Sequence, residues 1–238
     1  MSGPEPELRI AFDMDGVLAD MHAALAIEAE RMFGEQGPST VSALEEAIER
    51  ESPAPPPVSR LPGALTLTAQ QLEMLWQRVA ETDNFWDGLA ETEPGIVGRL
   101  ARVADQRRWE VLFVTQRPQT RGAPVQKQTQ FWLRRHGFDF PSVYTTRGSR
   151  GAIALALNLD VVVDDRFEGC VDVAAESGAR PILVWREPDE SVLARAHRLG
   201  IAVVRSAGEC LDLLETVDGR RASEPGLMSR LRHALRRK

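Results

Sequence analysis

The second half of the chain alternates short, unbroken apolar runs with segments whose apolar side chains recur at helical spacing. Unbroken apolar runs joined by helices are typical of a parallel sheet that is covered by helices on both faces. One predicted helix, for example, places Ile96, Val97, Leu100, Val103 and Ala104 on a single face. The predicted strands are 8–13, 111–114, 142–145, 161–163, 181–185 and 201–204, and the predicted helices between them are 95–104, 124–137, 150–158, a segment ending at Gly178, and 188–200.

Residues 20–90 interrupt this alternation with helical patterns and no strand of the parallel-sheet type. Thr68 and Gln71 have the spacing of a helix capping box. A helical insertion between the first and second strands is expected to lie over the strand ends, where it acts as a lid. The predicted helices here are 21–33, 43–50 and a segment holding Leu72, Leu75, Trp76 and Val79, and the proline-rich stretch 53–62 is a predicted connector.

The chain is therefore expected to be a doubly wound α/β protein with an inserted helical domain. Residues 1–19 and 88–216 form the predicted core, 20–87 the insertion, and 217–238 a basic tail. The last twenty residues carry seven basic side chains against one acid, Glu224. This tail is either a basic amphipathic helix that touches anionic membrane or nucleic acid, or a solvated terminus.

Composition narrows the possible classes of protein. The 238-residue chain is 43% hydrophobic and 27% charged, as is ordinary for a globular protein, and its net charge of −6 argues against a general nucleic-acid binder. It has no apolar run of about 18 residues, so no membrane span is expected. The first residues lack a basic start and an apolar stretch, so export is not expected. Two cysteines, Cys170 and Cys210, make no disulfide framework and indicate a reducing cytoplasm.

Polar side chains follow three of the predicted strands. Asp13 and Asp15 end the first, Thr115 ends the second, and Asp164 and Asp165 end the run 161–163. In a parallel sheet, neighbouring strand ends converge on one crevice. Two carboxylates about 4 Å apart repel by roughly 4 kcal/mol at an effective dielectric constant of about 20. Four of them need a cation, and hard oxygen ligands without Cys or His favour Mg²⁺.

These residues resemble four ordered motifs of the haloacid dehalogenase superfamily of phosphohydrolases. The motifs are DMDGVLAD at 13–20, FVT at 113–115, and an arginine followed after 13 residues by the pair DD at 164–165. The helical insertion after the first motif is similar to a C1-type cap of that superfamily. The segments FWDGLAETEPG at 85–95 and VVVDDR at 161–166 resemble its 5′-nucleotidase, or deoxyribonucleotidase-like, branch.

The resemblance implies a role for each matching residue. Asp13 corresponds to the nucleophile that attacks phosphorus and forms an aspartyl phosphate. Asp15 corresponds to the acid/base that protonates the leaving oxygen and then activates water. Thr115 corresponds to the hydroxyl that holds a phosphoryl oxygen.

The resemblance also implies a Mg²⁺ site formed by Asp13, the carbonyl of Asp15, and the pair Asp164 and Asp165. Which member of the pair ligates directly is left open, and the other is a candidate helix N-cap.

The basic position of the third motif, usually a lysine, corresponds to Arg150, with Arg147 as the alternative. An arginine keeps the charge and can clamp a phosphoryl group together with the nucleophile.

Four further residues are candidate substrate contacts. Arg117 and Arg121, which follow Thr115, are expected either to recognise a substrate phosphate or sugar or to be ordinary surface charges. Phe85 and Trp86 are candidates for stacking on a nucleobase, whereas Trp76 is expected to belong to the core of the insertion. The four candidates are Gln116, Arg117, Phe85 and Trp86.

The sequence and the resemblance together predict a cytoplasmic Mg²⁺-dependent phosphatase that hydrolyses a small phosphomonoester, with a nucleoside monophosphate as the preferred substrate. The alternatives are another phosphomonoester, such as a sugar phosphate or a 3′-phosphate end of nucleic acid, and a regulatory or binding protein that retains the fold without catalysis. Four clustered carboxylates argue against the last alternative, since a binding protein has no physical need for them.

Overall fold

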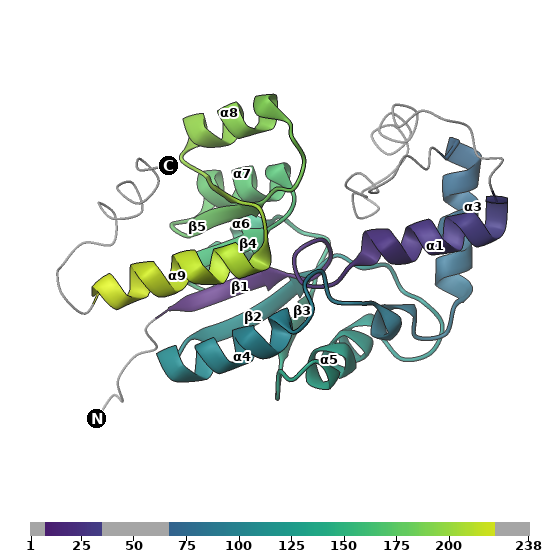
Figure 1. Ribbon diagram of the computed structural model, residues 1–238, viewed down its shortest axis with the longest axis horizontal. Coiled ribbons are helices and arrows are strands. Elements are labelled where there is room, and N and C mark those ends of the chain that lie inside the picture. Colours follow the sequence, from purple (N-terminus) through teal and green to yellow (C-terminus); the bar gives the residue numbers. More distant parts are fainter. Residues whose placement is uncertain (1–7, 35–66, 222–238) are drawn as a thin grey trace.

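The computed structural model describes residues 8–34 and 67–221. Its centre is a six-stranded, all-parallel sheet with the strand order β3-β2-β1-β4-β5-β6 (Figure 1). The doubly wound α/β fold predicted from the sequence is therefore confirmed. The strands are β1 (Arg9–Asp13), β2 (Glu110–Thr115), β3 (Ser142–Thr145), β4 (Val161–Asp164), β5 (Arg180–Val184) and β6 (Ala202–Val204).

The strand order places β1 in the middle of the sheet, between β2 and β4. Phe12 of β1 pairs in register with Phe113 of β2 and with Val163 of β4. The chain builds β2 and β3 on one side of β1 and then returns to build β4 on the other side. This reversal creates a crevice at the carboxyl ends of β1 and β4, the usual ligand position in open α/β sheets.

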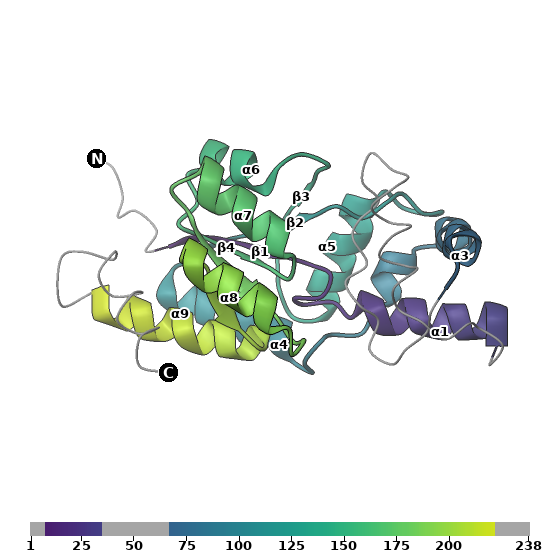
Figure 2. The ribbon, with the colours of Figure 1, turned by 90° about the horizontal axis from the view of Figure 1, so that it is seen from above.

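Helices cover both faces of the sheet because each buried strand presents apolar side chains to both faces (Figures 1 and 2). Ile10 and Phe12 belong to the cluster shared with α4, α5 and α9, whereas Ala11 belongs to a cluster with residues of α6 and α7. The helices of the sheet region are α4 (Ile96–Arg107), α5 (Val125–Arg135), α6 (Arg150–Ala156), α7 (Phe167–Glu176), α8 (Glu190–Leu199) and α9 (Ala207–Arg221).

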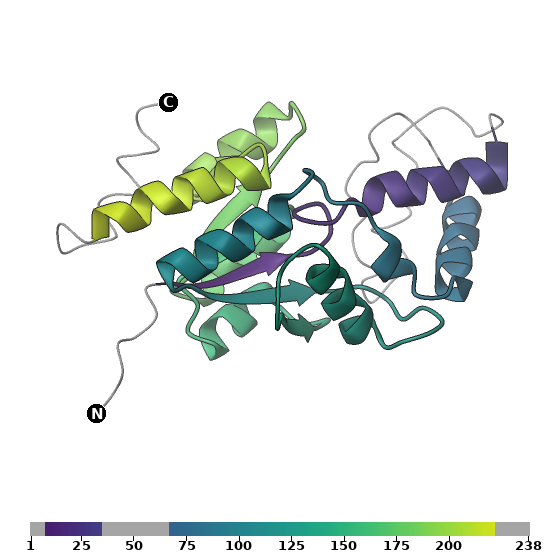
Figure 3. The same cartoon turned by 60° about the horizontal axis from the view of Figure 1, so that its bottom comes forward.

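Helices α1 (Met21–Phe33) and α3 (Ala69–Glu81) lie beyond the carboxyl ends of the strands (Figures 1 and 3). The predicted capping box is present, since Thr68 and Gln71 exchange side-chain and backbone hydrogen bonds. A short 3₁₀ helix, η2 (Phe85–Gly88), then leads back toward the sheet. The predicted helix 43–50 and connector 53–62 lie outside the described residues.

Two details differ from the sequence prediction. Pro124 is the N-cap of α5 and not its first helical residue. Helix α9 was not predicted, and it continues to Arg221, into the segment assigned to the tail. Its Leu211 and Leu214 pack in the main core.

Both cysteines are unpaired and buried, as expected. No helix in the described part of the chain is long and apolar enough to cross a bilayer.

Candidate active site

Three neighbouring strands end on the polar residues that the sequence singled out. Asp13 is the last residue of β1, Thr115 of β2 and Asp164 of β4. All three are buried, although each is polar. A small cavity at these strand ends is lined by Asp13, Asp15, Met21, Thr115, Gln116, Arg150, Asp165 and Arg166. Its volume of about 20 Å³ accommodates a single water molecule or ion.

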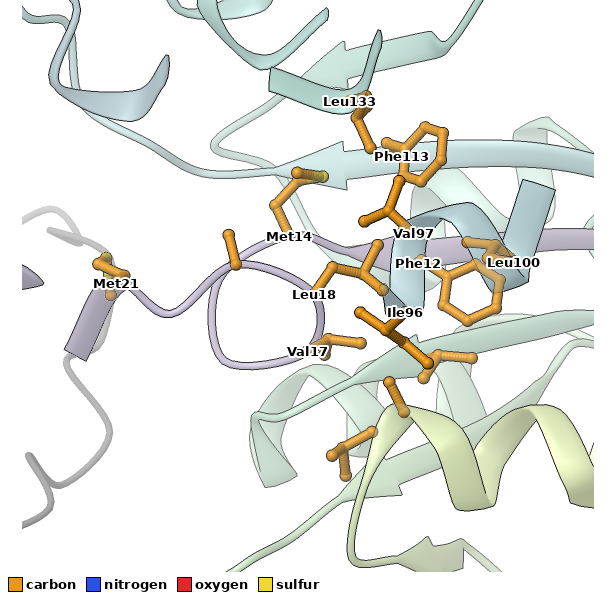
Figure 4. Packing of buried hydrophobic residues seen from close by; sticks show 14 of the residues in the cluster. Phe12, Met14, Val17, Leu18, Met21, Ile96, Val97, Leu100, Phe113 and Leu133 are labelled. Atoms are coloured by element: carbon orange, nitrogen blue, oxygen red, sulfur yellow. The ribbon is translucent and has the colours of Figure 1, made fainter. Parts of the chain in front are cut away.

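The loop after β1 is held by its own apolar side chains. Met14, Val17 and Leu18 are fully buried and lie near Ile96 and Val97 of α4 (Figure 4). The carbonyl of Met14 accepts hydrogen bonds from the amides of Leu18 and Ala19, at 2.9 and 2.7 Å. Apolar anchors that flank the two aspartates therefore fix the position of the carboxylates on the sheet.

Gly16 lets the Asp165 carboxylate approach this loop closely. Gly16 has φ +75°, and a Cβ atom built there would lie 1.8 Å from Oδ2 of Asp165. A side chain at position 16 would thus be strained and would occupy the place of the carboxylate. The glycine explains how the loop after β1 and the Asp165 segment line the same cavity.

We predict that Gly16→Ala lowers the free energy of unfolding by about 1–3 kcal/mol and displaces Asp165. Gly95→Ala is the matched control, because Gly95 has φ +80° but no atom within 4 Å of a built Cβ. Urea unfolding of both variants separates backbone strain from the clash with Asp165. Equal losses in the two variants would contradict a role for the close approach.

Arg150, the first residue of α6, connects two of the carboxylates. Its Nε donates to Asp164 at 3.1 Å, and its Nη2 forms a short ion pair with Asp13. Arg150 is 5% exposed and Asp164 is fully buried. Arg147, the alternative for the basic position, is exposed. The structure therefore brings Arg150, and not Arg147, to the candidate nucleophile.

Asp15 is held by a second buried arginine. Arg117 donates from Nε to both carboxylate oxygens of Asp15, at 2.8 and 3.1 Å, and from Nη2 at 2.7 Å. Its Nη1 donates to the Thr129 hydroxyl at 3.0 Å. The possibility that Arg117 is an ordinary surface residue is wrong, since its side chain has no exposed area. Arg121 is the surface residue of the two, with a side chain that is 67% exposed.

Three buried donors at the cavity have no hydrogen-bond partner among the residues that the structure describes. They are the Thr115 hydroxyl, Nη1 of Arg150 and Nε of Arg166. All three residues line the cavity. Buried polar groups are nearly always paired, so unpaired donors around one cavity indicate a place for an anionic ligand. Gln116 also lines the cavity, and its side-chain oxygen accepts from Nη1 of Arg166 at 3.0 Å.

Burial and the neighbouring carboxylates raise the proton affinity of Asp13. Burial raises the pKa of Asp13 well above its ordinary value; Arg150 opposes this rise, and the charges of Asp164, Asp165 and Asp15 add to it. A cation at the cavity would offset this burden, and oxygen donors alone suit Mg²⁺. Three of the predicted metal residues, Asp13, Asp15 and Asp165, line the cavity.

The expected convergence of all four carboxylates on one ion is not formed in this arrangement. Among residues 8–34 and 67–221, no group of three acidic, histidine or cysteine side chains is placed to hold a metal. The physical reason is that Arg150 contacts Asp13 and Asp164, while Arg117 occupies both side-chain oxygens of Asp15. The oxygen donors fit a hard cation in kind, and their side chains would have to rotate to surround it.

The two aromatic candidates for base stacking do not reach the cavity. Trp86 is fully buried, and its indole N–H donates to the carbonyl of Pro118 at 2.9 Å. Its ring faces the Arg117 guanidinium at 4.9 Å, and the half-buried Phe85 meets it edge-on at 5.0 Å. The expectation that Trp86 stacks on a ligand is therefore wrong in this structure: its ring surface is taken up by the core. Trp76 packs against the same core, as expected.

Comparisons with known proteins identify the fold. No family model matches the sequence, and no curated protein matches it. Solved structures do match: a HAD family hydrolase from Deinococcus radiodurans R1 with bound phosphate and sodium has a TM-score of 0.51 at 20% identity, over 91% of this chain and 98% of that one. A phosphonoacetaldehyde hydrolase-like protein from Oleispira antarctica has a TM-score of 0.52 at 14% identity, over 94% and 100%.

A candidate beta-phosphoglucomutase from Thermotoga maritima has a TM-score of 0.53 at 20% identity, over 88% of this chain and 99% of that one. At these identities the likeness defines the fold. The sheet and helices of this chain form the Rossmann-like fold of haloacid dehalogenase-type hydrolases.

Proposed function

We propose that this chain is a Mg²⁺-dependent phosphatase that hydrolyses a small phosphomonoester through an aspartyl phosphate on Asp13. One observation carries the proposal: buried donors of Thr115 and Arg150, which have no partner within the described part of the chain, line the same cavity as the carboxylates of Asp13 and Asp15. Donors for an anion beside two acids suit a reaction in which a phosphoryl group is bound, attacked and released.

Each residue has a defined task in this proposal. The Asp13 carboxylate attacks phosphorus, while the Thr115 hydroxyl and Arg150 hold the oxygens of the phosphoryl group. Asp15 gives its proton to the leaving oxygen as the bond from phosphorus to that oxygen breaks. Asp15 then takes a proton from the water whose oxygen attacks the aspartyl phosphate, and phosphate leaves Asp13.

A bound Mg²⁺ would supply positive charge that neutralises the transferring phosphoryl group. We assign its ligation to Asp13, the carbonyl of Asp15, and the pair Asp164 and Asp165. Asp165 is the member of that pair that lines the cavity, whereas Asp164 accepts from Arg150 and, at 2.9 Å, from the amide of Arg166. Asp165 is therefore the better candidate for a direct ligand.

We also propose that residues 20–87 form a C1-type cap, with 1–19 and 88–216 as the core domain. The position of α1 and α3 beyond the strand ends supports this division (Figure 3), and Met21 of α1 lines the cavity. The basic tail, 217–238, lies largely outside the described residues. The two unpaired cysteines support a cytoplasmic location.

The cavity leaves three substrate classes to be compared. The preference for a nucleoside monophosphate comes from the resemblance of segments 85–95 and 161–166 to 5′-nucleotidases, and the two residues offered for base stacking, Phe85 and Trp86, do not line the cavity. A sugar phosphate needs no such stacking, and the fold is shared with a candidate beta-phosphoglucomutase. We therefore retain both, together with 3′-phosphate ends of nucleic acid, as substrates to be compared directly.

A phosphate-release screen tests the function. We expect hydrolysis of at least one nucleotide, sugar phosphate or aryl phosphate in the presence of Mg²⁺, and a return of activity when Mg²⁺ is added back after treatment with EDTA. No release from any class of phosphomonoester with Mg²⁺, Mn²⁺ or Co²⁺ would argue for the non-catalytic alternative. Equal rates with and without a divalent cation would remove the assigned metal site.

A further inference from the structure

The fork between Arg117 and Asp15 is more than a surface ion pair. Both carboxylate oxygens of Asp15 accept from Arg117, through three contacts of 2.7 to 3.1 Å. With the backbone atoms counted, Asp15 is 9% exposed and Arg117 is 6% exposed, so both residues are buried. A bidentate arginine fixes the plane of a carboxylate as well as its position.

Arg117 is itself held from two sides. Thr129 of α5 accepts from its Nη1, and the hydroxyl of Thr129 donates in turn to the carbonyl of Val125 at 2.9 Å. The ring of Trp86 in η2 lies 4.9 Å from the centre of the guanidinium. The backbone N–H of Trp86 donates to the side chain of Gln128, also on α5, at 3.1 Å. Arg117 is therefore held by contacts from α5 and from η2, the segment that returns from α3.

We propose that Arg117 is a positioning residue for Asp15, which it holds in the orientation needed to exchange a proton with the leaving oxygen and then with water. This inference rests on the proposed phosphatase function, in which Asp15 is the acid/base. Arg117 contacts both Asp15 and the Trp86 ring. It therefore connects the acid/base to η2, the segment that leads back from the helices over the strand ends.

Leaving groups of different acidity test this role. An acid that donates a proton to the leaving oxygen matters most when the leaving group is a poor one. Loss of a well-placed general acid or base reduces rates by roughly 10²–10⁴-fold. For Arg117→Lys, which keeps the charge and loses the fork, we expect a loss of roughly 10²-fold on phenyl phosphate. On p-nitrophenyl phosphate, whose leaving phenol is far more acidic, we expect a loss of less than about tenfold.

Two further variants test whether the loss comes from the contacts of Arg117. Thr129→Val removes the hydroxyl that accepts from Arg117, and we expect a smaller loss with the same dependence on the leaving group. Arg121→Gln is the control, because that arginine is exposed and lies 3.5 Å from its partner, Asp83. We expect wild-type rates on both substrates. A loss that is equal on the two substrates in Arg117→Lys would overturn the positioning role and leave a merely structural one.

A stability measurement keeps the inference testable if the aryl phosphates are not substrates. In urea unfolding, Arg117→Gln and Asp15→Asn are each expected to lower the midpoint, and the double variant is expected to lower it by less than the sum. Additive losses would show that the pair is not coupled and would overturn the inference. An inactive wild type with a coupled pair would instead count against the phosphatase function alone.

Discussion

Asp13→Asn is expected to abolish Mg²⁺-dependent phosphate release and to leave the fold intact. The amide has nearly the shape of the carboxylate but cannot attack phosphorus, so the covalent route is lost and the rate falls by at least about 10³-fold. The buried site contains three other acids whose charges raise the pKa of Asp13. Removal of one charge relieves that repulsion, which offsets the lost ion pair with Arg150.

The measurement is single-turnover and steady-state phosphate release, with urea unfolding of the same preparations. Asp83→Asn is the control, because the Asp83 side chain is 66% exposed and lies outside the cavity. We expect it to match the wild type in both rate and midpoint. Turnover by Asp13→Asn equal to that of the wild type would remove the assigned nucleophile, whatever the fate of the metal site.

The sheet could be predicted from the sequence because its strands are buried on both faces. The run Val111–Val114 has no polar interruption, and β4 is buried throughout. Helix α9 was not predicted because its apolar side chains follow the helical period only weakly. Its Leu211 and Leu214 nevertheless lie in the main core. Glu93 also helps to start this helix, since its carboxylate accepts from the amides of Ala207 and Gly208, a contact between residues distant in sequence.

The strand-end acids could be predicted because each directly follows an apolar run. That position alone places Asp13 and Asp164 at the same edge of a parallel sheet. The adjacency of β1 and β4, which brings the two acids together, was an assumption that the strand order confirms.

The pairing of Asp15 with Arg117 could not be predicted in this way. The two residues are 102 positions apart, and no local pattern distinguishes Arg117 from the exposed Arg121. The contacts of Arg117 with α5 and η2 arise only from tertiary packing. Trp86 was misread for a similar reason: a tryptophan near the return from an insertion has the same sequence signal whether its ring faces a ligand or the core. The only available hint was the proximity of Arg117 to Thr115, the end of a motif-bearing strand.

Arg150→Met is expected to destabilise the chain by about 3–5 kcal/mol in the absence of a divalent cation. The variant keeps the apolar stem but removes the guanidinium that contacts both Asp164, which is fully buried, and Asp13 beside it. Two buried carboxylates without a counter-charge are costly, and one of them must take up a proton. Urea unfolding with EDTA measures this loss.

Mg²⁺ should then restore part of the lost stability, because a cation that binds the folded state alone stabilises it by mass action. Arg150→Lys, which keeps the charge without the fork, should lose much less stability than Arg150→Met and retain measurable phosphate release. Arg147→Met is the matched control at an exposed position and should behave as the wild type. If Arg147→Met were the more damaging variant, the basic position of the third motif would belong to Arg147. If Arg150→Met were as stable as the wild type in EDTA, the buried acids would not depend on that arginine, and the charge balance proposed for the site would be wrong.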